Sequence, residues 1–143
     1  MMVHPDDMPK CRREVDLVIR ADIPDPDREP QLHELVTRVN LHHLCHERKR
    51  RGQEVFCMVD DKHCKSKFPK SFSDKTIITR RQVLYKRPEN GVVFMNLKSG
   101  EVFTNQQVVP YNPFLSLEMQ TNTNVEICSQ EAQSAKHVNL YIN

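Results

Sequence analysis

The stretch Val108-Val109-Pro110-Tyr111-Asn112-Pro113-Phe114-Leu115 decides how the rest of this sequence is organised. Its first six residues combine β-branched residues with two prolines. β-branched residues favour extended backbone, and proline lacks the N–H group that a helix interior needs. The sequence therefore predicts an extended segment over residues 108–113.

Strand-prone segments lie on both sides of this stretch. Before it, Pro88-Glu89-Asn90-Gly91 is a turn signal, because Asn-Gly favours the positive φ angles of a hairpin. A second connection is expected around Lys98-Ser99-Gly100. We therefore expect a mostly antiparallel β section from about residue 76 to 128, with strands at 76–79, 82–85, 92–95, 101–104 and 124–128.

Helical signals occur towards both ends of the chain. Residues 31–44 have the spacing i, i+3, i+4, i+7 of one buried helix face, at Leu32, Leu35, Val36 and Val39. Residues 11–20 form a short amphipathic piece, either helical or extended, and the prolines of 21–30 predict an extended connector. Ser129 can cap a final helix that runs towards Tyr141. The expected fold class is α+β.

Positive charge is concentrated in the middle of the chain. Residues 48–87 carry thirteen Lys/Arg against four Asp/Glu, a net charge of +9, whereas residues 1–47 have −4 and residues 88–143 have −3. Phosphate binding needs such a block, since each neutralised phosphate releases counterions. A solvated basic face or a nuclear-targeting run is the alternative. The candidate phosphate contacts are Lys65, Lys67, Lys70, Arg80 and Arg81.

Cysteine and histidine gather in an irregular segment at about 42–75. Four of them have spacings compatible with a tetrahedral zinc site: His42, Cys45, Cys57 and Cys64. This region has few core-forming residues, so a metal could take the place of a core. His43, His46 and His63 are alternative donors, and ordinary buried or free thiols are the alternative interpretation.

Composition limits where the chain is expected to act. Hydrophobic residues make up 38% of the 143 residues, and no run approaches the 18 apolar residues of a membrane span. The polar start of the chain resembles no signal peptide. We therefore expect a nuclear or cytoplasmic protein without a membrane partner, whose five cysteines are thiols or metal ligands.

A tyrosine near the end of the chain is a candidate nucleophile. His137 and Tyr141 are four residues apart and would share one face of a helix. A tyrosine hydroxyl on such a face can attack a DNA phosphodiester when a metal polarises the phosphate. A packing tyrosine is the more common alternative.

Several of these stretches, taken together, resemble the helicase-like, Rep-type region of Helitron rolling-circle transposases. The resemblance covers nearly the whole chain, residues 1–143, as one partial domain. It is most specific in the opening stretch Val108–Leu115, followed by Asn124-Val125-Glu126-Ile127-Cys128. It also includes His4–Asp7, Ala21–Pro26, Leu32–Val36, Cys57 and Cys64–Phe72.

The resemblance implies an HUH-type nuclease joined to an ATP-dependent DNA helicase. In the family, two histidines bind a divalent metal (Mg or Mn), and paired tyrosines cut one DNA strand. Tyr141 matches the second tyrosine as a vestigial nucleophile, and His137 replaces the first. The chain has neither the matching His-x-His pair nor the helicase's phosphate-binding loop.

Three functions are consistent with these patterns. The first is a transposase fragment, catalytically inactive alone, that binds DNA, in particular single-stranded DNA, through its basic block. The second is a working nuclease that uses Tyr141 with metal ligands such as His42 and His43. The third is a small zinc-stapled interaction module without enzymatic activity.

Overall fold

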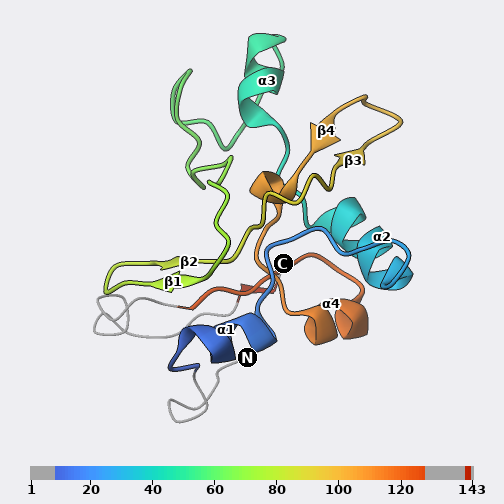
Figure 1. Cartoon of the computed structure of the whole chain (residues 1–143). Coiled ribbons are helices and arrows are strands. Elements are labelled where there is room, and N and C mark those ends of the chain that lie inside the picture. The colour runs from blue at the N-terminus through green and yellow to red at the C-terminus, as the bar shows by residue number, and fades with distance from the viewer. Residues whose placement is uncertain (1–8, 128–140, 143) are drawn as a thin grey trace.

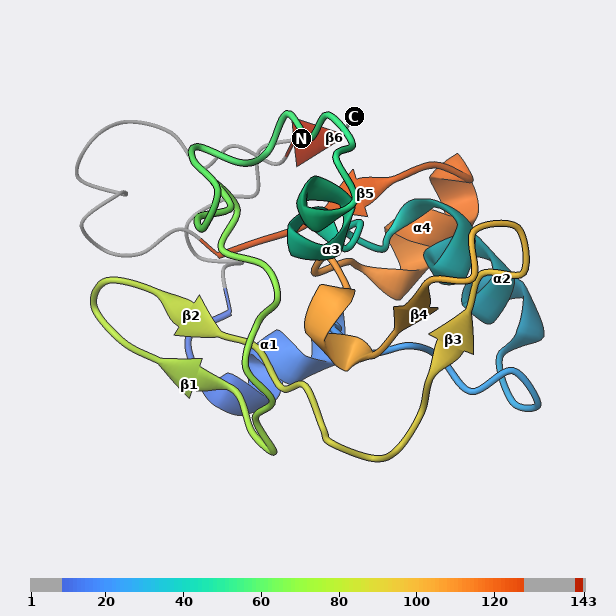
Figure 2. The same ribbon diagram turned by 90° about the horizontal axis from the view of Figure 1, so that it is seen from above.

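The computed structural model describes residues 9–127 together with residues 141 and 142. In this part of the chain, short helices combine with three separate two-stranded antiparallel sheets, of which the first two along the chain project at the periphery (Figures 1 and 2); this confirms the α+β class. The helices are α1 Arg12–Val18, α2 Pro30–Val39, α3 Cys45–Arg50, the 3₁₀ helix η2 Asn105–Gln107, and α4 Pro113–Met119. The strand pairs are β1 Ile77–Ile78 with β2 Val83–Leu84, β3 Phe94–Met95 with β4 Val102–Phe103, and β5 Thr123–Asn124 with β6 Tyr141–Ile142.

The extended segment 108–112 lies at the centre of the fold, as expected. Tyr111 exchanges two backbone hydrogen bonds with Arg20, at 2.8 and 2.9 Å. The Val109 N–H donates to the carbonyl of Asn40 at 2.9 Å, and the Pro110 carbonyl accepts from Val125 at 3.0 Å. One short segment therefore joins the connector after α1, the end of α2 and the chain beyond β5.

Helix α4 follows this segment and was not predicted. Asn112 is still extended, and its side-chain oxygen accepts from the Leu115 N–H at 2.9 Å. Pro113 then occupies the first turn, where its fixed φ suits a helix and its missing N–H costs nothing. The prediction of extended backbone is therefore right up to Asn112 and wrong at Pro113.

Helix α2 supplies the main core. It covers Pro30–Val39 rather than 31–44 and ends at Asn40, whose backbone leaves helical geometry. Its predicted apolar face is buried at Leu32, Leu35 and Val36, and Val39 is half-buried. Leu32 and Val36 pack with Ile23, Val108 and Tyr111, and α2 also packs against α4.

Asn40 joins three segments inside the protein. Its side chain is 2% exposed. The amide nitrogen donates to the carbonyls of Val109 and Thr123, both at 2.9 Å, and the amide oxygen accepts from the Thr123 N–H at 3.0 Å. Because buried polar groups need partners, this residue holds β5 against the end of α2.

The predicted hairpin at Asn90-Gly91 is wrong. Gly91 has the expected positive φ of 74°, but β2 pairs with β1 and β3 pairs with β4. The hairpins instead close within residues 79–82 and 96–100, the second through Gly100 at φ 71°. After β2, Tyr85 and Arg87 turn into the interior, which carries the chain away from β3.

The predicted C-terminal helix does not include Tyr141. Residues 141 and 142 form β6, whose partner is the β5 strand at Thr123 and Asn124. An available strand edge and a β-prone Tyr-Ile pair favour this arrangement over helix. The earlier part of the predicted helix, residues 129–140, lies outside the described residues.

Candidate metal centre and basic groove

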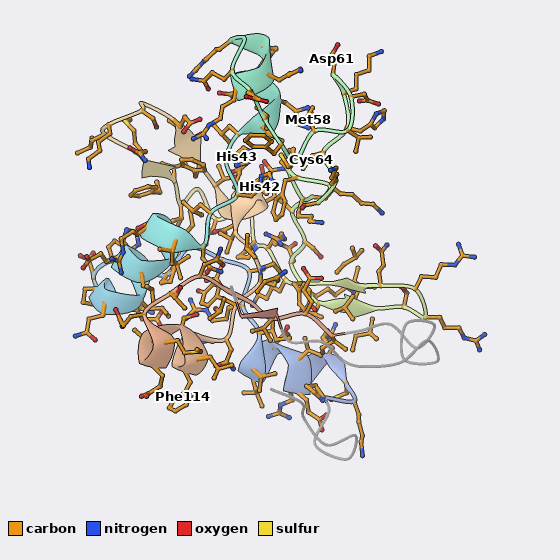
Figure 3. All side chains as sticks on the ribbon, turned by 180° about the vertical axis from the view of Figure 1, so that it is seen from behind. His42, His43, Met58, Asp61, Cys64 and Phe114 are labelled. Atoms are coloured by element: carbon orange, nitrogen blue, oxygen red, sulfur yellow. The ribbon has the colours of Figure 1, made fainter. Side chains whose placement is uncertain are left out.

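Three side chains meet at a possible metal site. The ligand atoms of His42, Cys57 and Cys64 all lie within 4.8 Å of one another. Figure 3 shows His42 and His43 at the base of α3, with Met58 and Cys64 approaching from the facing loop. Cys and His atoms at this separation could hold a metal ion.

Local backbone contacts build the two walls of this site. On one wall, the His42 N–H donates to the Gln107 carbonyl at 2.8 Å, just before α3 begins. On the other, Met58 and Cys64 form an antiparallel bridge, and the Lys65 N–H donates to the Cys57 carbonyl at 2.7 Å. This bridge closes a loop, so two cysteines seven positions apart in sequence lie side by side.

The fourth predicted ligand, Cys45, lies in the same cluster. It is 1% exposed and packs with Cys64 and Phe68. Burial, together with hydrogen bonding to Cys64, raises the pKa of the Cys45 thiol. All four predicted ligands are therefore brought together, although Cys45 is outside the tightest group of three.

The two neighbouring histidines suit metal binding. The Nδ1–H of His42 donates to the His43 carbonyl at 2.8 Å, since a carbonyl can only accept. Nε2 is then the unprotonated nitrogen whose lone pair can bind a metal, and this atom lies 3.7 Å from the Cys64 sulfur. Burial lowers the pKa of His42 and of His43, so both imidazoles are neutral at pH 7, which is the form that binds a metal.

Among the three further histidines predicted as donors, His43 is the nearest to the cluster. Its Nε2 lies 3.2 Å from the Cys57 sulfur, and its ring stacks on His42 at a centroid distance of 4.5 Å. His46 instead contacts the Phe68 carbonyl, and His63 pairs with Asp60 at the exposed loop. His43 is therefore the histidine best placed to replace one of the four predicted ligands.

The thiols differ in how readily they ionise. Burial raises the pKa of Cys57 to about 12, and the neighbouring thiols Cys64 and Cys45 add to this. Burial also opposes ionisation of Cys64, but hydrogen bonds from the backbone N–H groups of Phe68 and Ser66 and from the Cys57 and Cys45 thiols together lower that pKa. Cys64 is therefore the first thiolate to form, and hence the first to attract a cation.

A basic groove adjoins the cluster on the side of the β1–β2 hairpin. It has a volume of about 780 Å³. Segment 67–73, the hairpin and residues 124–127 line it. Two rings, Phe72 and Tyr85, lie among the lining side chains, with one acidic residue, Glu126, and four cations: Lys67, Lys70, Arg81 and Arg87.

Three of the predicted phosphate contacts line this groove. Lys67, Lys70 and Arg81 do so, whereas Lys65 and Arg80 are exposed outside its lining. Arg87 is an additional lining residue that the sequence did not single out. It is one of thirteen cations in the block, and only its burial distinguishes it.

Arg87 is a buried cation held by carbonyl groups. It is 3% exposed, and its Nη1 donates to the carbonyls of Asn105 and Val108, both at 2.7 Å. Within residues 9–127, no carboxylate lies within ion-pair distance of it. Burial lowers its pKa to about 10, so it stays charged at pH 7. A desolvated charge of this kind favours a bound anion.

Lys70 shares this environment. Burial lowers the pKa of Lys70; the Glu126 carboxylate opposes this shift, whereas the charges of Arg87 and Lys67 add to it. The lining carries four cations against Glu126 alone, which leaves a net charge of +3. The groove is therefore suited to a negatively charged ligand.

Not every cation of the basic block is free for a ligand. Arg48 forms two hydrogen bonds of 2.8 Å to Glu101, whose side chain is 3% exposed. This bidentate pair lowers the pKa of Glu101 and joins α3 to the turn before β4. Arg48 therefore has a structural role.

Neither the metal cluster nor the groove lining includes the predicted nucleophile, Tyr141. The backbone of Tyr141 lies in β6, and His137 lies outside the described residues.

Neither protein-family models nor curated proteins match this chain. No helix in the described part of the chain is both long and apolar enough to cross a membrane.

Proposed function

We propose that this chain is a zinc-stapled module that binds single-stranded DNA along the basic groove. The observation that carries the proposal is the groove itself, where four cations and two aromatic rings line one volume of about 780 Å³. The metal cluster lies next to one wall of this groove, since Cys64 and Lys67 are joined by a backbone hydrogen bond of 2.9 Å.

Zinc suits the donor set better than magnesium or calcium. Cys45, Cys57, Cys64 and His42 offer three thiolates and one imidazole, which is a common tetrahedral zinc set, whereas magnesium and calcium prefer oxygen. The segment around them has little other core, because its apolar cluster is built on two of these cysteines and Phe68. Bound zinc would stabilise the fold of this segment in place of a larger apolar core.

Single-stranded nucleic acid fits the mixture of rings and cations. Bases of a single strand can stack on aromatic side chains while cations follow the backbone phosphates. Tyr85 is 8% exposed and packs in the core with Val15 and Ile19, so half-buried Phe72 is the lining ring on which a base can stack. In a duplex the bases are already stacked, so Phe72 would have no such role. The resemblance to Helitron Rep-type regions favours DNA over RNA, and a parallel titration with RNA distinguishes the two.

DNA binding should depend on salt and on the groove cations. We expect log K to fall with log [salt] at a slope of roughly −2 to −3, since each phosphate contact on single strands contributes about −0.7. Replacing Lys67 and Arg81 by Gln should reduce the steepness of that slope by about 1.4. The measurement is a fluorescence titration of labelled oligo(dT) at several salt concentrations.

The matched control removes the same charge elsewhere. Arg38 lies exposed on α2, and Lys98 lies exposed in the β3–β4 turn, both outside the groove lining. Arg38→Gln with Lys98→Gln should leave the slope nearly unchanged. Equal losses in both pairs of variants would reject the groove as the binding site. Stoichiometric zinc without DNA affinity would favour the interaction-module alternative.

Zinc binding should release protons. The pKa of Cys57, at about 12, and the raised pKa of Cys45 mean that both thiols carry protons at pH 7. Binding must displace these protons, so we expect release of at least about two protons per zinc and an affinity that rises with pH. Calorimetry in buffers of different ionisation enthalpy measures this number. A value near zero would show that these thiols are not ligands.

A further inference from the structure

Phe68 touches both the metal cluster and the groove cations. Its ring stacks on the imidazole of His42, with centroids 4.4 Å apart and an interplanar angle of 16°. The Lys70 ammonium lies 5.0 Å from the centre of the same ring, and the Arg87 guanidinium carbon lies 5.9 Å from it. One side chain thus contacts a candidate zinc ligand and the two most desolvated cations of the groove.

The backbone around Phe68 reinforces this connection. Cys64 lies four residues earlier, and the N–H of Lys67, the residue before Phe68, donates to the Cys64 carbonyl at 2.9 Å. Lys70 is then anchored by its own N–H, which donates to the Gln106 carbonyl at 3.0 Å. Phe68 itself is 7% exposed and belongs to the apolar cluster of Cys45 and Cys64.

We propose that Phe68 is a positioning residue through which bound zinc places Lys70 and Arg87 for phosphate binding. The proposal rests on the function proposed above and adds a regulation to it. Zinc fixes His42 and Cys64, which fixes the stacked ring. The ring in turn holds two cations at the distances that attract them to its face.

Coupling between zinc binding and DNA binding can be measured as a change in the affinity for DNA. If zinc orders the Phe68 ring and the two cations beforehand, these side chains lose less conformational entropy when DNA binds, so DNA binds more tightly. Coupled sites typically change each other's affinity by about fivefold or more. Linkage is reciprocal, so DNA must raise the affinity for zinc by the same factor.

The test is a thermodynamic cycle on the full chain. The dissociation constant for labelled oligo(dT) is measured with zinc and after chelation, for the wild type and for Phe68→Leu. The wild type should bind about fivefold or more tightly with zinc. Phe68→Leu should still take up cobalt, a spectroscopic probe of the thiolate site, while its zinc effect on DNA binding falls below about twofold.

Phe72→Leu is the matched control. It removes a groove ring that belongs to neither the metal set nor the Phe68 contacts. This variant should bind DNA more weakly while it keeps the full ratio between the zinc-loaded and chelated states. Phe68→Met provides a second aliphatic variant if Phe68→Leu is poorly folded by circular dichroism.

The separate measurements show which part fails. A full zinc effect in folded Phe68→Leu or Phe68→Met overturns the role of Phe68. A wild type that binds both zinc and DNA with no effect of one on the other overturns the coupling. Loss of zinc uptake or of DNA binding in the wild type overturns the coupling together with that half of the proposed function.

Discussion

Saturating zinc is expected to raise the free energy of unfolding by about 4 kcal/mol when free zinc exceeds its dissociation constant a thousandfold. The reason is that the four ligands are brought together only in the folded chain, so zinc binds that state and not the unfolded one. Cys57 and Cys64 lie on a long irregular loop after α3, and their apolar cluster contains only one large buried side chain, Phe68. Urea unfolding with zinc and with a chelator measures the difference.

Two cysteine variants make this prediction specific. Cys64→Ser should abolish the zinc effect, because a hydroxyl is a poor substitute for a buried thiolate. Cys11→Ser is the control, since Cys11 is an exposed free thiol away from the cluster. Its zinc effect should match that of the wild type. A chelator-insensitive unfolding curve for the wild type would contradict a structural metal.

Asn40→Ala is expected to lower the free energy of unfolding by roughly 3 kcal/mol or more. The substitution removes three buried hydrogen bonds, two to Val109 and Thr123 carbonyls and one from the Thr123 N–H. These backbone groups would stay buried without a partner, and each such group costs about 1–3 kcal/mol. Urea unfolding of the zinc-saturated protein measures the loss.

The comparison for this variant is an exposed asparagine. The Asn90 side chain accepts from Val92 at 3.1 Å in an exposed turn, where water can replace the lost contact. It also accepts from the Asn105 amide at 3.4 Å, but that amide keeps its shorter bond of 2.8 Å to the Pro88 carbonyl. Asn90→Ala should therefore cost less than about 1 kcal/mol. Similar losses in the two variants would show that Asn40 is not the link between α2 and β5.

Short-range patterns accounted for several elements of the fold. Helix α2 was expected from the spacing of Leu32, Leu35 and Val36, because that spacing places them on one helix face whatever surrounds it. Extended backbone over Val108–Asn112 followed from local preferences in the same way. The start of α4 was also readable in principle, since Asn112-Pro113 is an N-cap followed by a first-turn proline.

Strand pairing could not be obtained from local patterns. Asn90-Gly91 supplies the backbone geometry of a turn, but it does not choose the strands that pair. Burial of Tyr85 and Arg87 directs the chain away from β3, and that burial depends on α1 and on segment 105–108. Tyr141 pairs with Asn124 for a similar reason, because β5 offers it an edge.

Residue types and their spacing were enough to predict the α+β class, the helix at α2, the concentration of positive charge in residues 48–87 and the four candidate zinc ligands. These features depend on residue type and spacing along the chain. The folded chain was needed to see that Phe68 stacks on His42, that Arg87 is buried beside the groove and that Lys65 and Arg80 lie outside it. Burial and cross-chain contact arise from packing between distant segments, and thirteen cations in one block look alike until that packing buries one of them.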